Sequence, residues 1–449
     1  MEDLDEKANP SSSYPTAATA AGVHDTNNCQ TFAPSKGEKA LDVFIFGIFG
    51  FILQIFFSIG ISASQDILEE TLVPTPALLI SASLPFFFIT SAMPYFILKL
   101  PQTFLLVPIV FLSIIGVLLY SLVENVVIRI VGVVIVSTGV AIGEVTFVSL
   151  TALYGDRAMS AYAAGTGIGF IIGPLYYTAM TTVICVSPQT TVLLISWIPL
   201  SIFLCYALIE KRDYAPVPGH DSYQDIAYTS LPQENAPTEE NSTTWSEKQA
   251  LIVQNFHLVV AFFVGYFSEF LTLNGVVTTL AFPNSPFDPR NHFVYYACVF
   301  MIGECIGRSY ISFLAFINLQ YALVITKTWI LSVILFGLLN LLTLASWYRF
   351  LPSVWIVLLL CFVVGLLAGS LYLNTYLVVT ARGQDDEKGK AFSRAFLSVG
   401  PSAGVLFAGI VGLGLEPALR THCLESSHFR EFCFTRSMYG WNKTTSCLR

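Results

Sequence analysis

The stretch from 126 to 153 reads VVIRIVGVVIVSTGVAIGEVTFVSLTAL, with one acid, Glu144, and one base, Arg129. It is longer than the roughly 20 apolar residues that a helix needs to cross a bilayer. A carboxylate inside hydrocarbon is costly unless it meets a partner or a hydrated cavity. We therefore predict a membrane-spanning helix here and a candidate functional residue in Glu144.

Ten further stretches have the same apolar character. The 449 residues are 54% hydrophobic and only 12% charged, whereas soluble domains are about 25% charged. A membrane β-barrel would need short segments of alternating polarity, and the sequence has none. We predict an all-α polytopic membrane protein with about 11 transmembrane helices, near 41–63, 76–98, 103–123, 126–153, 159–184, 190–209, 251–282, 292–316, 321–346, 352–380 and 393–415.

Polar segments divide the chain into two bundles. The predicted parts are a disordered cytosolic N-terminal tail (1–40), a six-helix bundle (41–210), a cytosolic linker (211–250), a five-helix bundle (251–415) and a lumenal C-terminal tail (416–449). Two bundles joined by a long linker are typical of major-facilitator transporters, whose halves rock about a site at the membrane midplane. The second half is one span short of the usual six.

The distribution of Lys and Arg predicts the orientation, because short cytosolic loops carry an excess of them. With the N-terminus in the cytosol, the cytosolic loops hold more of these residues than the lumenal ones, and the tail is lumenal. We expect glycosylation at Asn442, in the sequence Asn442-Lys443-Thr444. The tail cysteines Cys423, Cys433 and Cys447 could be disulfide-bonded in such a lumen or remain free thiols. Cysteines in or beside the spans are expected to pack among apolar side chains: Cys185, Cys205, Cys298, Cys305 and Cys361.

Polar residues recur in the first, fourth, seventh and tenth spans, which line the central cavity in a major-facilitator fold. They are Gln54, Glu144, Glu269 with Asn274, and Asn374. The alternative is that the amides join helices by hydrogen bonds. Glu269 lies near the middle of its span, with Tyr266 one turn away, and suits a group that takes up and releases protons.

Two charged residues of the eighth span share one face of the helix. Glu304 and Arg308 are four residues apart, which predicts an intrahelical ion pair. The planar guanidinium of Arg308 could meet an anionic solute. Alternatively, Arg308 extends along the helix to the membrane surface.

A glycine stripe marks the fifth span. Gly165, Gly169 and Gly173 are spaced four apart, with Gly167 between the first two. Such a stripe lets helices approach closely. It is not a nucleotide-binding loop, because no strand precedes it and its spacing fits neither common glycine fingerprint.

Signatures of other functions are missing from the sequence. It contains no metal-binding histidine cluster and no hydrolase motif, so we expect no enzyme activity, no cofactor and no metal. No basic stripe indicates a nucleic-acid partner. The expected partners are the lipid bilayer, a small-molecule solute and protons.

Several short motifs resemble the battenin family, lysosomal membrane proteins whose human member is lost in juvenile neuronal ceroid lipofuscinosis. They are Gly143-Glu144-Val145-Thr146-Phe147, Ser149-Leu150-Thr151-Ala152, Gly165-Thr166-Gly167, Ser187-Pro188-Gln189, Tyr266-Phe267-Ser268-Glu269 and Tyr372-Leu373-Asn374-Thr375. The resemblance runs from about 41 to 423 and is strongest from 139 to 200. Glu144, Gly165, Gly167, Glu269 and Arg308 match functionally sensitive positions of the family. Pro401 stands where the family would have an aspartate, so no role of that aspartate carries over.

The resemblance implies a major-facilitator-like protein of the lysosomal or late endosomal membrane. We expect a transporter-like protein that exports a small anionic or zwitterionic solute of the glycerophosphodiester class, coupled to protons. The alternative is a non-transporting regulator of lysosomal pH, basic amino acid handling or trafficking that acts through cytosolic partners. Adaptor proteins are further expected partners, because the linker region holds tyrosine-based and acidic dileucine sorting patterns formed by Tyr223 with Ile226, Tyr228 with Leu231, and Glu247 with Leu251 and Ile252.

Overall fold

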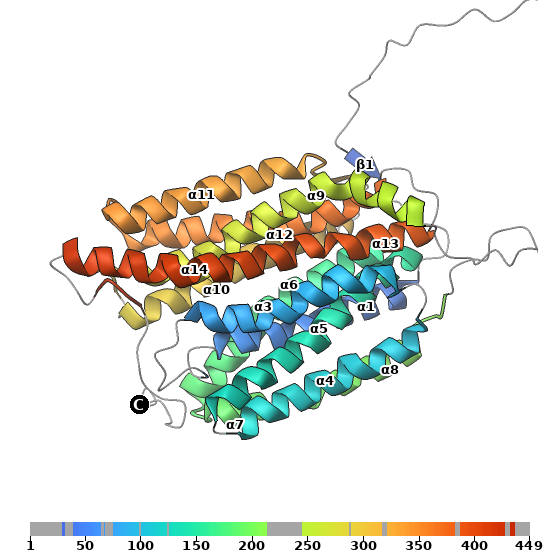
Figure 1. Ribbon diagram of the computed structural model, residues 1–449, viewed down its shortest axis with the longest axis horizontal. Helices are drawn as coiled ribbons and strands as arrows, with labels where there is room; N and C mark the ends of the chain where they lie inside the picture. Colours follow the sequence, from blue (N-terminus) through green and yellow to red (C-terminus); the bar gives the residue numbers. More distant parts are fainter. Residues whose placement is uncertain are drawn as a thin grey trace, which may run out of the picture.

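The helices of the computed structural model run roughly parallel to the long axis of the molecule (Figure 1). Eleven candidate membrane spans occur in the described part of the chain, as predicted. The all-α membrane fold is therefore confirmed. The structure describes residues 29–31, 39–63, 67, 75–97, 100–123, 125–212, 245–286, 289–316, 321–381, 387–426 and 432–435.

The N-terminal half, blue to green in Figure 1, contains six spans. Its elements are α1 (Ala40–Ser62), α3 (Thr75–Ala92) with the short η1 (Met93–Tyr95), α4 (Gln102–Leu122), α5 (Val126–Tyr154), α6 (Asp156–Thr178) with the π-helix η3 (Ala179–Val183), α7 (Pro188–Leu193), η4 (Ile198–Leu200) and α8 (Ser201–Leu208). The helix pair α7 and α8 with η4 forms the sixth span.

The C-terminal half, yellow to red, contains five spans. Its elements are α9 (Trp245–Leu271) with the π-helix η5 (Thr272–Val276) and η6 (Val277–Thr279), α10 (Pro289–Phe316), α11 (Thr328–Tyr348), α12 (Val354–Ala381), α13 (Glu387–Leu397) and α14 (Val399–Ser426). π-Turns inside helices occur often at functional sites. The π-helix η5 follows α9 and begins three residues after Glu269.

The ninth span was predicted to begin at 321, and this prediction is wrong. Tyr321–Leu323 is a strand, β2, which pairs antiparallel with β1, Cys29–Thr31, and α11 begins only at Thr328. A short apolar run fits a helix or a strand equally well by hydropathy. The partner strand Cys29–Thr31 lies in the tail that was expected to be disordered, and its sequence Cys-Gln-Thr has no apolar pattern.

The last span is longer than predicted and is interrupted. It covers Glu387–Ser426, against the expected 393–415, and breaks at Ser398 between α13 and α14. Pro401 accounts for the break, because a proline clashes with the carbonyl four residues earlier, here that of Leu397. The seventh span also begins earlier than expected, at Trp245.

The two halves meet along three helix pairs. Helix α6 packs against α10, α3 against α14, and α5 against α13. One end of the bundle carries the start of α1, the end of α8 and the start of α9; we call it the linker side. The other end carries the ends of α1 and α14, and we call it the far side.

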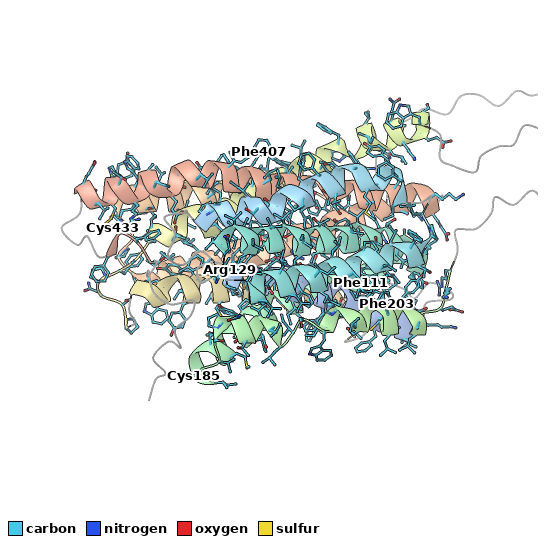
Figure 2. All side chains as sticks on the ribbon, turned by 60° about the horizontal axis from the view of Figure 1, so that its bottom comes forward. Phe111, Arg129, Cys185, Phe203, Phe407 and Cys433 are labelled. Carbon is cyan, nitrogen blue, oxygen red and sulfur yellow. A yellow bond between two sulfur atoms is a disulfide. The ribbon has the colours of Figure 1, made fainter. Side chains whose placement is uncertain are left out.

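The outer surface is apolar, as contact with lipid requires. Phe104 on α4 is 73% exposed and Phe88 on α3 is 62% exposed, so large hydrophobic side chains cover the outer helices. Phe111 and Phe407 lie on the same surface (Figure 2).

Candidate functional site

A cavity of about 620 Å³, including its open side, lies between the two halves. Eight helices from both halves contribute to its wall. The lining residues are Gln54, Phe57, Ser83, Phe86, Val140, Glu144, Phe170, Tyr266, Phe270, Arg308, Tyr372, Ser398, Pro401, Ser402 and Val405. The wall is largely aromatic and aliphatic, with a few charged and hydroxyl groups, which is typical of a small-molecule site.

Arg308 is the cationic group of this wall. Its side chain is 3% exposed, so it does not extend along the helix to the membrane surface. Its Nε and Nη2 donate to Glu304 Oε1 over 2.9 and 2.5 Å, which is the intrahelical pair that the spacing predicts. The guanidinium stacks on Tyr372, 4.0 Å from the ring centroid. An arginine held by a carboxylate and an aromatic face has a fixed orientation.

Two further hydrogen bonds reach Arg308 from different halves of the protein. Nη2 donates to the Tyr266 hydroxyl of α9 over 3.0 Å, and Nη1 donates to Thr166 Oγ1 of α6 over 2.8 Å. Thr166 therefore joins the N-terminal half to the arginine of the C-terminal half.

Glu269 lies behind the wall of the cavity. Its side chain is 1% exposed, and neither carboxylate oxygen has a hydrogen-bond partner among the described residues. Glu304 and Arg308 of the neighbouring helix lie within electrostatic reach. An ionised carboxylate without a partner is costly in such a place.

Glu144 connects the halves on the other side of Arg308. Its Oε2 accepts a hydrogen bond from Tyr162 of α6 over 2.5 Å, and its Oε1 accepts one from Tyr372 of α12 over 2.7 Å. The carboxylate lines the cavity and is half-buried. It is thus accessible to a solute and at the same time bonded to both halves.

The three predicted amides have different positions. Gln54 lines the central cavity, whereas Asn274 lines a second one. Asn374 faces neither: its Oδ1 accepts from the backbone of Ile325 over 2.7 Å, and its Nδ2 donates to the carbonyl of Ser370 over 2.7 Å. Tyr310 also contacts it. This geometry is that of an amide that joins helices, which was the alternative for Asn374.

The second cavity continues the first toward the far side. The two share Phe57 and Val140, and the second is lined by α1, α3, α4, α5 and Asn274. Gly60 and Leu78, near the far-side ends of α1 and α3, belong to its wall.

On the linker side of the cavity, polar side chains join the halves. Arg394 of α13, fully buried, donates to Asp156 Oδ1 over 2.6 Å and to Thr151 Oγ1 over 2.9 Å. Lys248 of α9 donates to the carbonyl of Tyr95 over 3.3 Å. The protein is therefore held together at this end.

The predicted glycine stripe lies in the closest helix contacts. A Cβ atom on Gly165 would lie 1.9 Å from the carbonyl oxygen of Gly47, and one on Gly173 would lie 2.0 Å from Ser58 Oγ. Gly169 also faces α1, whereas Gly167 faces Cys305 and Arg308 of α10. Gly165, Gly169 and Gly173 thus pack α6 against α1, whereas Gly167 packs α6 against α10 of the other half.

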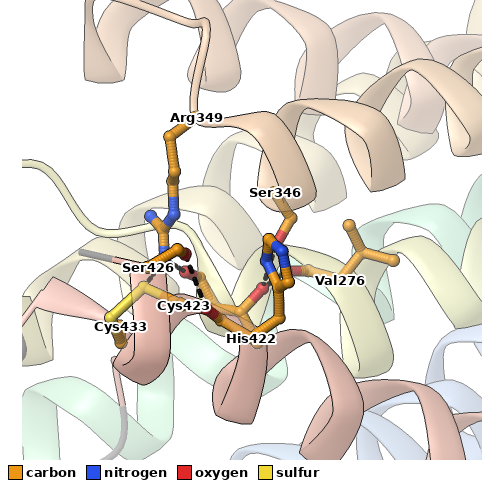
Figure 3. The surroundings of a disulfide bond; sticks show 8 residues. Val276, Ser346, Arg349, His422, Cys423, Ser426 and Cys433 are labelled. Carbon is orange, nitrogen blue, oxygen red and sulfur yellow. Dashed lines mark hydrogen bonds between the residues drawn. A yellow bond between two sulfur atoms is a disulfide. The ribbon is translucent and has the colours of Figure 1, made fainter.

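On the far side, a disulfide joins Cys423 of α14 to Cys433 (Figure 3). Beside it, Arg349 Nη2 donates to the carbonyl of Thr279 over 2.8 Å. The tail cysteines could have been disulfide-bonded or free, and the structure shows a disulfide for Cys423 and Cys433. Cys185 is also disulfide-bonded, so its predicted packing role is wrong. Cys185 and Cys433 lie toward the same end of the bundle in Figure 2.

Other predicted residues lie outside the described part of the chain. These are Asn442, Cys447 and the tyrosine patterns of Tyr223 with Ile226 and Tyr228 with Leu231. Glu247, Leu251 and Ile252 are described and belong to the first turns of α9, where both apolar residues are half-buried. In this structure the dileucine pattern is helical.

Sequence reasoning missed Thr166, Tyr162 and Arg394. Hydroxyl residues are frequent in membrane helices and gave no signal. Arg394 could have been noticed, because it is a cation inside the predicted span 393–415.

Similar solved structures define the class of protein. The Escherichia coli fucose:proton symporter FucP, in its outward conformation, superposes with a TM-score of 0.54 at 16% identity, over 85% of this chain and 98% of that one. A bacterial homolog of the human lysosomal transporter Spinster gives 0.52 at 15% identity, over 89% and 90%. The chain therefore has the fold of major-facilitator transporters, and its eleven candidate membrane spans fit a multi-pass membrane protein.

The CLN3 protein family matches residues 44–422, and the chain belongs to this family. Protein BTN1 of Yarrowia lipolytica is 32% identical over 386 residues, which cover 83% of this chain and 93% of that protein. Protein BTN1 of Saccharomyces cerevisiae is 28% identical, over 84% and 94%. The resemblance to the battenin family is thereby confirmed.

Proposed function

We propose that this protein exports a small anionic or zwitterionic solute of the glycerophosphodiester class across the lysosomal membrane, coupled to protons. Its N-terminus is cytosolic in this proposal, in keeping with the distribution of Lys and Arg. The observation that carries the proposal is Arg308, a buried guanidinium on the wall of a cavity between two halves.

A phosphodiester fits Arg308 because a guanidinium binds two phosphate oxygens through a pair of N–H groups. The cationic end of a zwitterion would find Glu144 and aromatic rings in the same wall. Quaternary ammonium groups bind to aromatic faces by cation–π attraction. Both ends of glycerophosphocholine therefore have suitable partners.

Proton coupling follows from the charges around the cavity. The described side chains there include three carboxylates, Glu144, Glu269 and Glu304, and one guanidinium, Arg308. A phosphate would add further negative charge to a poorly hydrated site, which is costly. Protonation of one carboxylate offsets the added negative charge, and we favour Glu269 as that carboxylate. Solute binding is then expected to strengthen as pH falls.

Named relatives of the fold are compatible with this proposal. FucP is a fucose:proton symporter. MFSD10, which is similar in fold with a TM-score of 0.53 at 13% identity, is a human organic anion transporter. Proton coupling and anion transport thus both occur on this scaffold.

The test is efflux of glycerophosphocholine from acidified proteoliposomes. Arg308→Lys should reduce the rate at least about tenfold, because a lysine cannot make the paired contacts of the fork. Arg420→Lys, an exposed arginine on α14, is the matched control and should export like the wild type. No efflux by the wild type would reject the transporter function.

A second arm tests the coupling. In Glu269→Gln the rate should lose its dependence on pH, because the amide cannot bind the proton. If wild type and Glu269→Gln export glycerophosphocholine equally at every pH, the coupling is wrong while transport itself can still hold.

A further inference from the structure

Arg308 has little hydrogen-bonding capacity left for a solute. Four of its five N–H groups are used: two by Glu304, one by Tyr266 and one by Thr166. The Nε–Nη2 edge belongs to Glu304, a residue of the same helix. An anion that binds two oxygens side by side must therefore use the Nη1–Nη2 edge.

At that edge Nη2 uses its second N–H group for the Tyr266 hydroxyl, and Nη1 donates to Thr166. Of the partners of Arg308, Glu304 and Tyr266 belong to the C-terminal half, and Thr166 alone of these three belongs to the N-terminal half. The Thr166 hydroxyl donates to the carbonyl of Ala163 over 2.7 Å, which aims its oxygen at Arg308. An anion on this edge thus displaces Tyr266 from Nη2 and competes with Thr166 for Nη1, and the bond to Thr166 is the one that joins the halves.

The helices are in near contact at this point. A Cβ atom on Gly167 would lie 3.0 Å from Cys305 Cα and 3.3 Å from Arg308 Cβ. Thr166, one residue earlier, is fully buried. The bond from Arg308 to Thr166 therefore lies where α6 and α10 approach closely, and its loss weakens this contact directly.

We propose that Thr166 links solute binding to the separation of the two halves. In the empty protein Thr166 accepts a hydrogen bond from Arg308, and the anionic group of the solute takes its place. This weakens the contact between α6 and α10, which also includes a hydrogen bond between Ser160 and Ser312 over 2.7 Å. Thr166 is a positioning residue in this account, and the inference rests on the proposed function above.

The test compares Thr166→Val with Thr146→Val. Valine has the shape of threonine without the hydroxyl, and Thr146 is a buried residue of α5 whose hydroxyl donates to its own helix, to Ile142 over 2.7 Å. Thr166→Ser keeps the hydroxyl and should behave like the wild type. Glycerophosphocholine binding is measured on the purified full-length protein in acidic buffer.

Thr166→Val should bind glycerophosphocholine up to about tenfold more tightly, because the solute no longer competes with a bond to a charged group. Without solute, the amides of α6 near Thr166 should exchange hydrogen faster than in the wild type. Thr146→Val should change neither quantity.

Equal affinity and equal exchange in Thr166→Val and wild type would overturn the inference. If the wild type binds no glycerophosphocholine, the proposed function fails instead, and the exchange measurement without solute still decides the role of Thr166. An affinity that weakens in Thr166→Val would also reject it, since the hydroxyl would then assist the solute.

Discussion

Arg394 and Asp156 are separated by 238 residues in sequence, yet Arg394 Nη2 lies 2.6 Å from Asp156 Oδ1. The arginine belongs to the C-terminal half and is fully buried, whereas the aspartate begins α6 of the N-terminal half and is 39% exposed. The pair thus joins the two halves on the linker side.

Asp156→Asn should destabilise the protein, because it removes the charge of the carboxylate that pairs with the buried Arg394 guanidinium. We expect a loss of about 1–3 kcal/mol, less than for a fully buried pair because Asp156 is partly exposed. The measurement is chemical unfolding in detergent micelles. Glu425→Gln, an exposed carboxylate on α14, is the control. If both variants had the same free energy of unfolding, the ion pair would not stabilise the contact between the halves.

Gly165→Ala should be poorly tolerated. Its methyl group would lie 1.9 Å from the carbonyl oxygen of Gly47, and backbone cannot move aside as a side chain can. We expect a loss of at least about 2 kcal/mol as α1 and α6 separate. Gly337→Ala on α11, whose new methyl meets no atom within 4 Å, should cost nothing. If both variants have the melting temperature of the wild type, Gly165 does not lie in a tight contact with α1.

Removal of the Cys423–Cys433 disulfide should loosen the far-side end of α9. The disulfide spans 10 residues and holds Thr435, whose backbone N–H donates to the carbonyl of Thr278 over 2.9 Å. Replacing both cysteines by alanine should lower stability by about 2–3 kcal/mol. Cys298→Ala, which removes a half-buried free thiol, should have a smaller effect on the melting temperature. If the double variant were as stable as this control, the disulfide would not stabilise the far side.

Lys39 makes the stability of the linker side depend on pH. Its Nζ lies 3.0 Å from Glu210 Oε1, and this hydrogen bond lowers the pKa of the Glu210 carboxyl. A lowered pKa in the folded state means that the ionised carboxylate adds stability above the ordinary carboxyl range, and that this is lost as pH falls through the lowered pKa. In Lys39→Met, a carbon-13 titration should find the Glu210 pKa nearer its ordinary value. An unchanged titration would show that Lys39 is not the cause.

The sequence predicts the number of spans and the place of Glu144, Glu269 and Arg308 within them. Long apolar segments are a local property, and a charge inside one is visible without any knowledge of its neighbours. The pairing of Glu304 with Arg308 was also accessible, because both lie on one helix four residues apart.

The sequence failed where the answer depends on a distant segment. Strand β2 was taken for helix because its partner, Cys29–Thr31, lies almost 300 residues away. Asn374 was predicted to line the cavity from its position along the span. In the structure its side chain instead bonds to Tyr310 of α10 and to the backbone of Ile325.

The amino-acid sequence by itself determined a membrane bundle of eleven spans with buried charges, because hydrophobic length and helical spacing act along the chain. Only the tertiary structure decided that Thr166 bonds to Arg308, that Tyr372 bonds to Glu144 and that Arg394 bonds to Asp156. Each of these bonds joins residues of different halves, and a hydrogen bond depends on ångström-scale distance and direction that only the packing of the helices sets.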